Sequence, residues 1–217
     1  MSRPTVEARL PRYCKTTRWF HWTFALSFLA LATTGAVLLL REALALEHGT
    51  VLGLVNAHKI IAVVFFSAPW LIAASGDTRR WLADMAEAMR FGRHDLEWLR
   101  GQGPALLRGT PLPAQDKLNA GQKLNAIAIA GIAGVMAGSG LHLWGDPGAF
   151  IALLLHLGGF IAWIPAFAVH LFMALVNPST RPALRGMVLG DVSRNWAEHH
   201  HGRWVERLDE ECGEADG

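Results

Sequence analysis

The sequence contains little charge and little cysteine. Only 18% of its 217 residues are charged, whereas 52% are hydrophobic, and this balance excludes an ordinary soluble domain of this size. The two cysteines, Cys14 and Cys212, are too few to hold even one iron–sulfur cluster with four thiolate ligands. The motif C-x-x-C-H is absent, which excludes covalent attachment of a c-type haem. Any iron–sulfur cluster that serves this protein must therefore belong to another chain.

Four apolar stretches are long enough to cross about 30 Å of hydrocarbon as helices, at about 1.5 Å per residue. We expect these helices at residues 19–40, 51–74, 124–144 and 150–176. The first is too long for a signal-peptide core and lacks a small-residue cleavage site, so we expect it to be retained. The predicted fold class is all-α, an integral membrane four-helix bundle.

The basic residues are distributed unevenly around the expected helices. Of the 20 Lys and Arg residues, five precede the first helix, eight lie in the loop 75–123 and five follow the fourth helix, which leaves only Arg41 and Lys59. The positive-inside rule therefore places both termini and this loop in the cytoplasm. The predicted organisation is a cytoplasmic arm of residues 1–18, a membrane domain of residues 19–176 and a cytoplasmic tail of residues 177–217.

Four histidines lie within the apolar segments, where an ionisable ring costs several kcal/mol unless something binds it. In the expected topology His21 and His170 lie near the cytoplasmic side, whereas His58 and His156 lie near the outer side. His156 and His170 are 14 residues apart, about 21 Å along a helix and within about 40° of one face. We interpret His21 with His170, and His58 with His156, as the axial ligands of two stacked, non-covalent b-type haems. Gly35 lies 14 residues after His21, where it would admit a planar ring.

The remaining polar features receive simpler interpretations. Residues 81–100 mix apolar and charged side chains, as an amphipathic helix at the membrane surface does, and residues 101–113 are expected to break it. We interpret His142 as an interfacial residue. The histidines outside the apolar segments are expected to be solvated, including His48, His94 and the cluster His199–His201.

These motifs resemble the cytochrome b gamma subunit of respiratory, membrane-bound formate dehydrogenases, within the four-helix bacterial dihaem cytochromes b. The resemblance spans nearly the whole chain. It rests on the spacing of His156 and His170 and on four motifs: T-T-R-W-F-H-W around His21, A-H-K around His58, L-N-A-G-Q-K at 118–123, and the tail R-G-M-V-L-G-D-V-S-R-N-W-A-E-H-H-H-G-R-W at 185–204. The H-H-H-G run and the rather long middle loop depart from the family.

The resemblance implies a quinone site and two partner subunits. It marks Asn119, Gly121 and Gln122, beside the inner haem ligand His170, as the place where menaquinone or ubiquinone is reduced. The residue types suit this role, because amides donate to a carbonyl, glycine permits close approach and Lys123 supplies positive charge. The implied partners are an iron–sulfur (beta) subunit at the outer face and, through it, a molybdenum- or tungsten-dependent catalytic (alpha) subunit. Membrane lipid, but no nucleic acid, is also expected to contact the chain.

We therefore expect an electron-transfer and quinone-reducing subunit whose substrate is oxidised on another chain. Electrons would enter at the outer haem, pass to the inner haem and reduce a quinone near the cytoplasmic face. One alternative is a cytochrome b that serves a hydrogenase or a thiosulfate reductase. A different class, a non-haem membrane anchor or proton-relay transporter, would show no haem absorption bands.

Overall fold

The computed structural model describes residues 8–215, so Arg3 of the basic arm lies outside the described residues. Within this range the predicted all-α class is confirmed, and four helices are long and apolar enough to cross a membrane. The described residues form two compact units, one of residues 13–84 and one of residues 8–12 with 85–215. The division at residues 18 and 176 stays a prediction.

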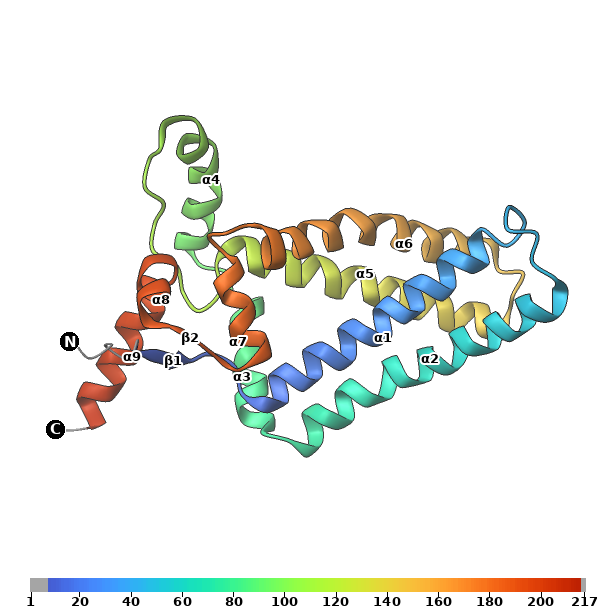
Figure 1. Ribbon diagram of the computed structural model, residues 1–217, viewed down its shortest axis with the longest axis horizontal. Helices are drawn as coiled ribbons and strands as arrows, with labels where there is room; N and C mark the ends of the chain where they lie inside the picture. Colours follow the sequence, from blue (N-terminus) through green and yellow to red (C-terminus); the bar gives the residue numbers. More distant parts are fainter. Residues whose placement is uncertain (1–7, 216–217) are drawn as a thin grey trace, which may run out of the picture. The chain divides into compact units, whose positions relative to one another are not determined.

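The unit of residues 13–84 is a hairpin of two long helices, α1 (Lys15–Leu39) and α2 (His48–Ser75), followed by the start of α3 (Thr78–Met89) (Figure 1). Both long helices begin a few residues before the predicted segments. The Phe24 and Phe65 rings lie 4.9 Å apart in the middle of the hairpin. At its open end the Thr16 hydroxyl oxygen accepts from the Asp77 backbone N–H at 2.7 Å. These contacts align the two helices antiparallel.

The second unit contains another antiparallel hairpin, of α5 (Ala120–Gly145) and α6 (Phe150–Leu171). The predicted fourth segment ended at residue 176, and the described chain does reach it, because α6 continues as a π-helical turn, η1 (Phe172–Val176). The two helices approach closely where α6 has a glycine. A Cβ atom at Gly159 would lie 2.6 Å from Met136 Cγ, so a larger residue there would force the helices or the methionine to shift.

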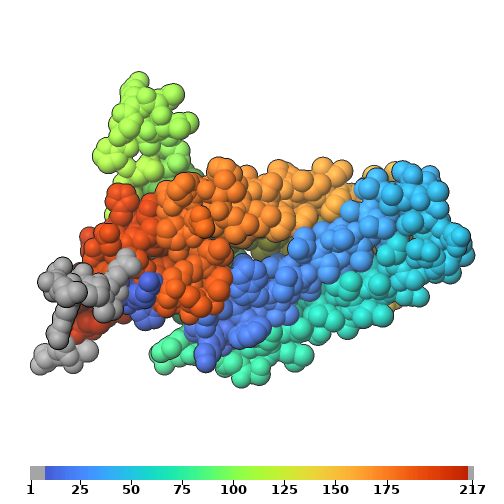
Figure 2. Space-filling model, viewed as in Figure 1, coloured from blue at the N-terminus to red at the C-terminus, as the bar shows by residue number. Residues whose placement is uncertain are grey.

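The amphipathic helix predicted at residues 81–100 is wrong in its bounds, because the chain forms two helices, α3 and α4 (Arg93–Arg108). Gly92 begins α4 as its N-cap, and its N–H donates to Asp95 Oδ2 at 2.8 Å. The predicted break over residues 101–113 is right only for its second half, because the helix continues through Arg108. The helix ends instead at Gly109, whose φ of 66° is the left-handed conformation that commonly closes helices. Figure 2 shows α4 in green, projecting from the rest of its unit.

Segments from early and late in the described chain meet in a small cluster that the sequence did not predict. Strand β1 (Arg9–Pro11) pairs antiparallel with β2 (Asp191–Ser193). Short helices surround this pair: η2 (Arg181–Ala183), α7 (Leu184–Val188), α8 (Arg194–His200) and α9 (Gly202–Ala215). Its core is buried and apolar, made of Val192, Ala197, Trp204 and Val205. We call this assembly the terminal cluster.

Candidate functional site

In the unit of residues 13–84, His21 and His58 occupy different levels of the hairpin. His58 on α2 lies beside Thr34 and Gly35 of α1: a Cβ atom at Gly35 would be 3.5 Å from His58 Cε1. His21 lies 14 residues before Gly35 on α1, which is about 21 Å along the helix and nearly the same face. The His21 ring meets the Trp22 ring edge-on, with centroids 5.3 Å apart.

A hydrogen bond to Thr34 sets the tautomer of His58. The Thr34 hydroxyl donates to the Ala30 carbonyl at 2.9 Å and lies 2.7 Å from His58 Nδ1. Because its one hydrogen is used, the hydroxyl oxygen accepts from His58 Nδ1–H. A neutral ring with its proton on Nδ1 carries its lone pair on Nε2, as a metal-ligating histidine does.

His156, on α6, is oriented in the same way by the backbone of α5. Its Nδ1 lies 2.9 Å from the Met136 carbonyl oxygen, which can only accept, so Nδ1 carries the proton and Nε2 the lone pair. The Ser139 hydroxyl adds a contact to Nδ1 at 3.3 Å. A Cβ atom at Gly140 would lie 3.0 Å from His156 Cε1, so glycine leaves room for this ring.

His170 lies one level further along α6, beside Asn125 of α5. The Asn125 Nδ2 atom is 3.3 Å from His170 Nδ1. As a donor, this amide would place the ring proton on Nε2. With the amide turned over, its oxygen would accept from Nδ1–H and leave the Nε2 lone pair for a metal. The pairing of His21 with His170 and of His58 with His156 joins the two units and stays a prediction.

The predicted quinone-site residues lie together at the first turn of α5, where they form a capping box. The Gln122 N–H donates to Asn119 Oδ1 at 2.9 Å, and the Asn119 N–H donates to Gln122 Oε1 at 3.0 Å. This reciprocal pair stabilises the start of the helix. It uses the two amide oxygens and leaves the two NH2 groups as donors toward other molecules.

Gly121 and Lys123 have packing roles that the sequence did not reveal. A Cβ atom at Gly121 would lie 3.4 Å from Trp98 Cη2 of α4, so the glycine admits this ring as well as any ligand. Lys123 is buried, and its ammonium contacts both Asp95 oxygens, at 3.0 and 3.1 Å. The positive charge expected at Lys123 is therefore balanced by a carboxylate.

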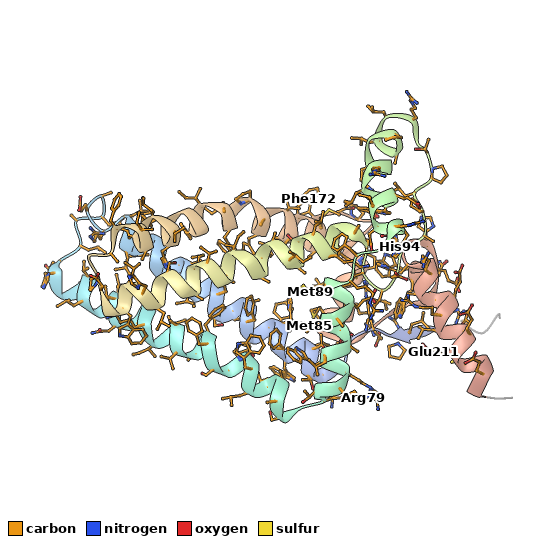
Figure 3. All side chains as sticks on the ribbon, turned by 180° about the vertical axis from the view of Figure 1, so that it is seen from behind. Arg79, Met85, Met89, His94, Phe172 and Glu211 are labelled. Carbon is orange, nitrogen blue, oxygen red and sulfur yellow. The ribbon has the colours of Figure 1, made fainter. Side chains whose placement is uncertain are left out.

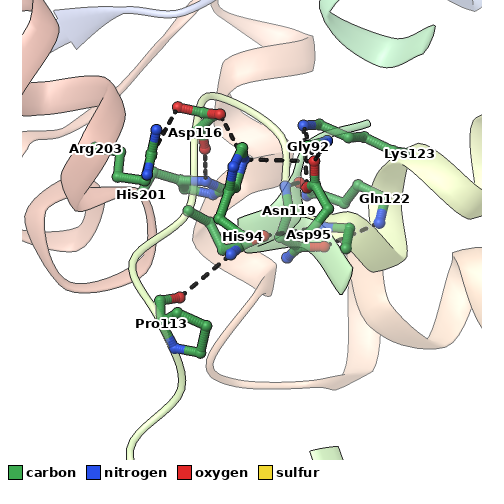
Figure 4. Close-up of polar contacts among 12 residues, drawn as sticks. Gly92, His94, Asp95, Pro113, Asp116, Asn119, Gln122, Lys123, His201 and Arg203 are labelled. Atoms are coloured by element: carbon green, nitrogen blue, oxygen red, sulfur yellow. Dashed lines mark hydrogen bonds and ion pairs between the residues drawn. The ribbon is translucent and has the colours of Figure 1, made fainter. Parts of the chain in front are cut away.

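Two histidines expected in solvent belong instead to a buried polar network (Figure 4). His94 Nε2 lies 2.8 Å from Asp116 Oδ2 and 3.4 Å from Asp95 Oδ2. His201 is only 1% exposed; its Nδ1–H donates to the Asp116 carbonyl at 2.6 Å and its Nε2 accepts from Arg12 at 3.2 Å. The prediction of solvated rings was wrong here because distant segments fold over them.

The buried ring of His201 makes stability depend on pH. Burial, and then the charge of Arg12, lower the pKa of His201 to about 3, whereas an unfolded histidine titrates near about 6.5. Stability is therefore independent of this group above about pH 6.5 and falls as the pH falls toward 3, because the unfolded chain then binds the extra proton. At pH 5 the loss is about 2 kcal/mol.

We expect the melting temperature to fall between pH 7.5 and pH 5.0, measured by circular dichroism in detergent. His201→Gln should flatten this dependence, whereas His199→Ala, at an exposed position, should keep it. Equal slopes for the parent protein and His201→Gln would show that another group is responsible.

The sequence profile of the prokaryotic cytochrome b561 family matches residues 12–190. The chain belongs to this family. It is also similar to the cytochrome b556(Fdn) subunit of the nitrate-inducible formate dehydrogenase of Escherichia coli K12, at 30% identity over 145 residues. The same figures hold for Shigella flexneri. In both comparisons the match covers 59% of this chain and 65% of the relative. The formate dehydrogenase cytochrome b556 subunit of Haemophilus influenzae is 24% identical over 210 residues, covering 91% of this chain and 83% of the relative.

Membership of the cytochrome b561 family implies that this membrane protein binds haem b. The residues present fit such a group. His58 and His156 have Nδ1–H committed to Thr34 and to Met136, so each ring offers Nε2 to iron. Glycines beside both rings, Gly35 and Gly140, leave room for the imidazoles themselves. The predicted cytochrome b identity is confirmed, and it excludes the alternative of a non-haem anchor.

The sequence did not reveal the residues that hold these histidines. Thr34, Asn125 and Ser139 are polar side chains within apolar helices, and such residues are expensive to bury without a partner. This cost of burial could have indicated that the three side chains have polar partners. No comparable indication marked Asp95, because it lies in a charged segment where solvent exposure is the ordinary expectation.

Proposed function

We propose that this cytochrome is the membrane subunit of a formate dehydrogenase complex, carrying electrons from a partner at the outer face to a quinone reduced near the cytoplasmic face. The observation that carries the proposal is the fixed Nδ1–H of His58 and of His156, on two different hairpins. Two imidazoles that carry their proton on Nδ1 and their lone pair on Nε2 suit the two axial positions of one iron. The similarity to formate dehydrogenase cytochrome b556 subunits favours this complex.

The pairing follows from the direction of the helices. The chain enters α1 and leaves α2 at the open end of one hairpin, and it enters α5 and leaves α6 at the open end of the other. If all four span one bilayer, these open ends share a side. His21 and His170 then share one level, and His58 and His156 share the other.

With these pairs bound, two b-type haems would supply one-electron transfer between the two sides of the membrane. The chain's own residues hold the ligands. Thr34 and the Met136 carbonyl orient the outer pair, whereas Asn125 orients His170 of the inner pair. Because two histidines would occupy both axial positions, oxygen activation is not expected.

The quinone would bind at the first turn of α5. The capping box holds Asn119 and Gln122 by their oxygens, so that both NH2 groups are available to a quinone carbonyl. Gly121 keeps the first turn open between Asn119 and Trp98. Menaquinone and ubiquinone both present the carbonyl that this donor pair recognises.

The topology and partners complete the proposal. Eighteen of the 20 basic residues lie on one side of the predicted spans, which supports cytoplasmic termini in a bacterial inner membrane. The connections on the other side are short, at residues 40–47 and 146–149, and suit a docking surface rather than a catalytic domain. An iron–sulfur (beta) subunit would dock there and link this chain to a molybdenum or tungsten catalytic (alpha) subunit.

Asn119→Ser and Gln122→Ala test the quinone site. Serine keeps the N-cap acceptor but removes the amide donor, so helix α5 should remain intact. Losing one neutral hydrogen bond, worth about 0.5–1.5 kcal/mol, should slow reoxidation of the pre-reduced cytochrome by a quinone analogue by about 2- to 13-fold. Stopped-flow absorbance measures this rate. The control is Asn195→Ala in the tail, which should change neither rate nor haem content, and unchanged rates in both test variants would place the site elsewhere.

A further inference from the structure

A chain of ionisable side chains runs from solvent to Lys123, next to the proposed quinone site. It begins at Asp116, whose Oδ1 contacts Arg207 at 2.6 Å and Arg203 at 3.5 Å, and these two arginine side chains are nearly half exposed. It passes through His94 to Asp95, and ends at the ammonium of Lys123. The side chains of Asp116 and His94 are 8% and 19% exposed, whereas those of Asp95 and Lys123 are 0% and 1% exposed.

The local structure explains how His94 reaches both carboxylates. A Cβ atom at Gly92 would lie 2.8 Å from His94 Cε1, so only glycine at this N-cap lets the ring turn toward Asp95 and Asp116. His94 lies at the base of α4, near the start of α5 (Figure 3). The same ring nitrogen, Nε2, faces both carboxylates, at 2.8 and 3.4 Å.

A structural role alone accounts for only part of this arrangement. Asp95 already accepts from the Gly92 N–H and pairs with Lys123, so α4 is capped and the buried charge is balanced without His94. Asp116 is likewise paired with Arg207. An imidazole between two satisfied carboxylates adds a ring that can accept a proton from one side and pass it to the other.

We infer that His94 and Asp95 carry protons from the solvent at Asp116 to Lys123, for use at the quinone. This inference rests on the proposed quinone site at Asn119–Gln122. Lys123 follows Gln122 directly in the first turn of α5, and its ammonium lies on Asp95. Among the described residues, the charged groups that face His94 are Asp95 on its own helix and Asp116 before α5, and Asp116 is paired with Arg203 and Arg207 of α9.

The proton steps balance as follows. Lys123 Nζ gives a proton to a quinone carbonyl oxygen as the quinone takes electrons from the cytochrome, and the ammonium becomes an amine. Asp95 receives a proton from the His94 imidazolium and passes it to that amine. Water beside Asp116 then recharges His94. Two such cycles deliver two protons, which together with two electrons convert the two carbonyl groups of the quinone to hydroxyls.

The test measures reoxidation of the haem-loaded, dithionite-reduced protein by decylubiquinone, in stopped flow. His94→Ala should slow reoxidation by about 100-fold, the range of a lost proton-transfer group, and millimolar imidazole should restore much of the rate. His94→Gln, which keeps a polar side chain if the alanine variant fails to fold, should be slow and should also be rescued. His199→Ala, an exposed histidine, is the matched control and should react at the parent rate.

The outcomes separate the two proposals. If Asn119→Ser and Gln122→Ala react at the parent rate, the quinone site is misplaced and the proton path loses its destination. If those variants are slow but His94→Ala and His94→Gln react at the parent rate, the proton path is wrong and the quinone site stands. Slow variants that imidazole does not rescue would also overturn the path, because a merely structural loss is not repaired by a free base.

Discussion

Replacing His58 or His156 by alanine removes one haem b and leaves the other, and replacing His21 or His170 does the reverse. This is the expected result because each iron needs two axial imidazoles, and a ring whose Nδ1–H is already committed, as in His58 and His156, offers its Nε2 strongly. Haem content should fall from about two per chain to about one. Pyridine haemochrome assay and low-temperature spectra of the four purified variants measure the content and identify the lost species.

The matched control for haem loss is His142→Ala, at an exposed position near the end of α5, which should keep both haems. Thr34→Val is more discriminating, because it removes the partner of His58 Nδ1 without touching a ligand. It should loosen the same haem that His58→Ala abolishes. The pairing is wrong if the His58 and His170 variants lose the same spectral species.

The second large effect is on stability, from the buried pair of Lys123 and Asp95. Their side chains are 1% and 0% exposed, so Asp95→Ala leaves an ammonium in the interior without a counter-charge. Breaking such a pair from one side costs about 3–5 kcal/mol. Denaturant titration in detergent, followed by circular dichroism, should therefore show a large drop in the free energy of unfolding.

The double variant Asp95→Leu with Lys123→Met should recover most of that loss, because it removes both charges and keeps the volume. For comparison, Arg80→Ala breaks an exposed pair with Asp77, which should cost no more than about 1 kcal/mol. Equal losses in Asp95→Ala and the double variant would mean that packing, and not the unpaired charge, dominates at this position.

The membrane helices were predictable because their main determinant is local. Hydropathy over 20 or so residues decides whether a helix suits a bilayer, and the observed α1 and α2 differ from the predicted segments only by a few residues at their ends. The start of α5 at Asn119 was also predictable in kind, since an asparagine three residues before a glutamine is a common capping pair.

The polar network could not be predicted, because its contacts join segments that are distant in sequence. Asp95 and Lys123 are 28 residues apart, and Arg12 and His201 are 189 residues apart. Nothing in the neighbourhood of His201, a run of polar and charged residues, indicates that its ring is buried. The end of α4 was missed because a local signal was misleading. A Cβ atom at Gly101 would lie 3.0 Å from Leu112 Cδ2, so this glycine allows close packing inside the helix and does not end it.

The strand pair of the terminal cluster determines when folding can finish. Arg9 of β1 contacts Asp191 beside the other end of the chain, 182 residues later. At synthesis rates of about 5–20 residues per second, the first strand waits roughly 9–36 s for its partner to be made. All four apolar helices are synthesised in that interval. The cluster therefore closes after membrane insertion, and a chain that terminates early exposes an N-terminal strand that never finds its pair.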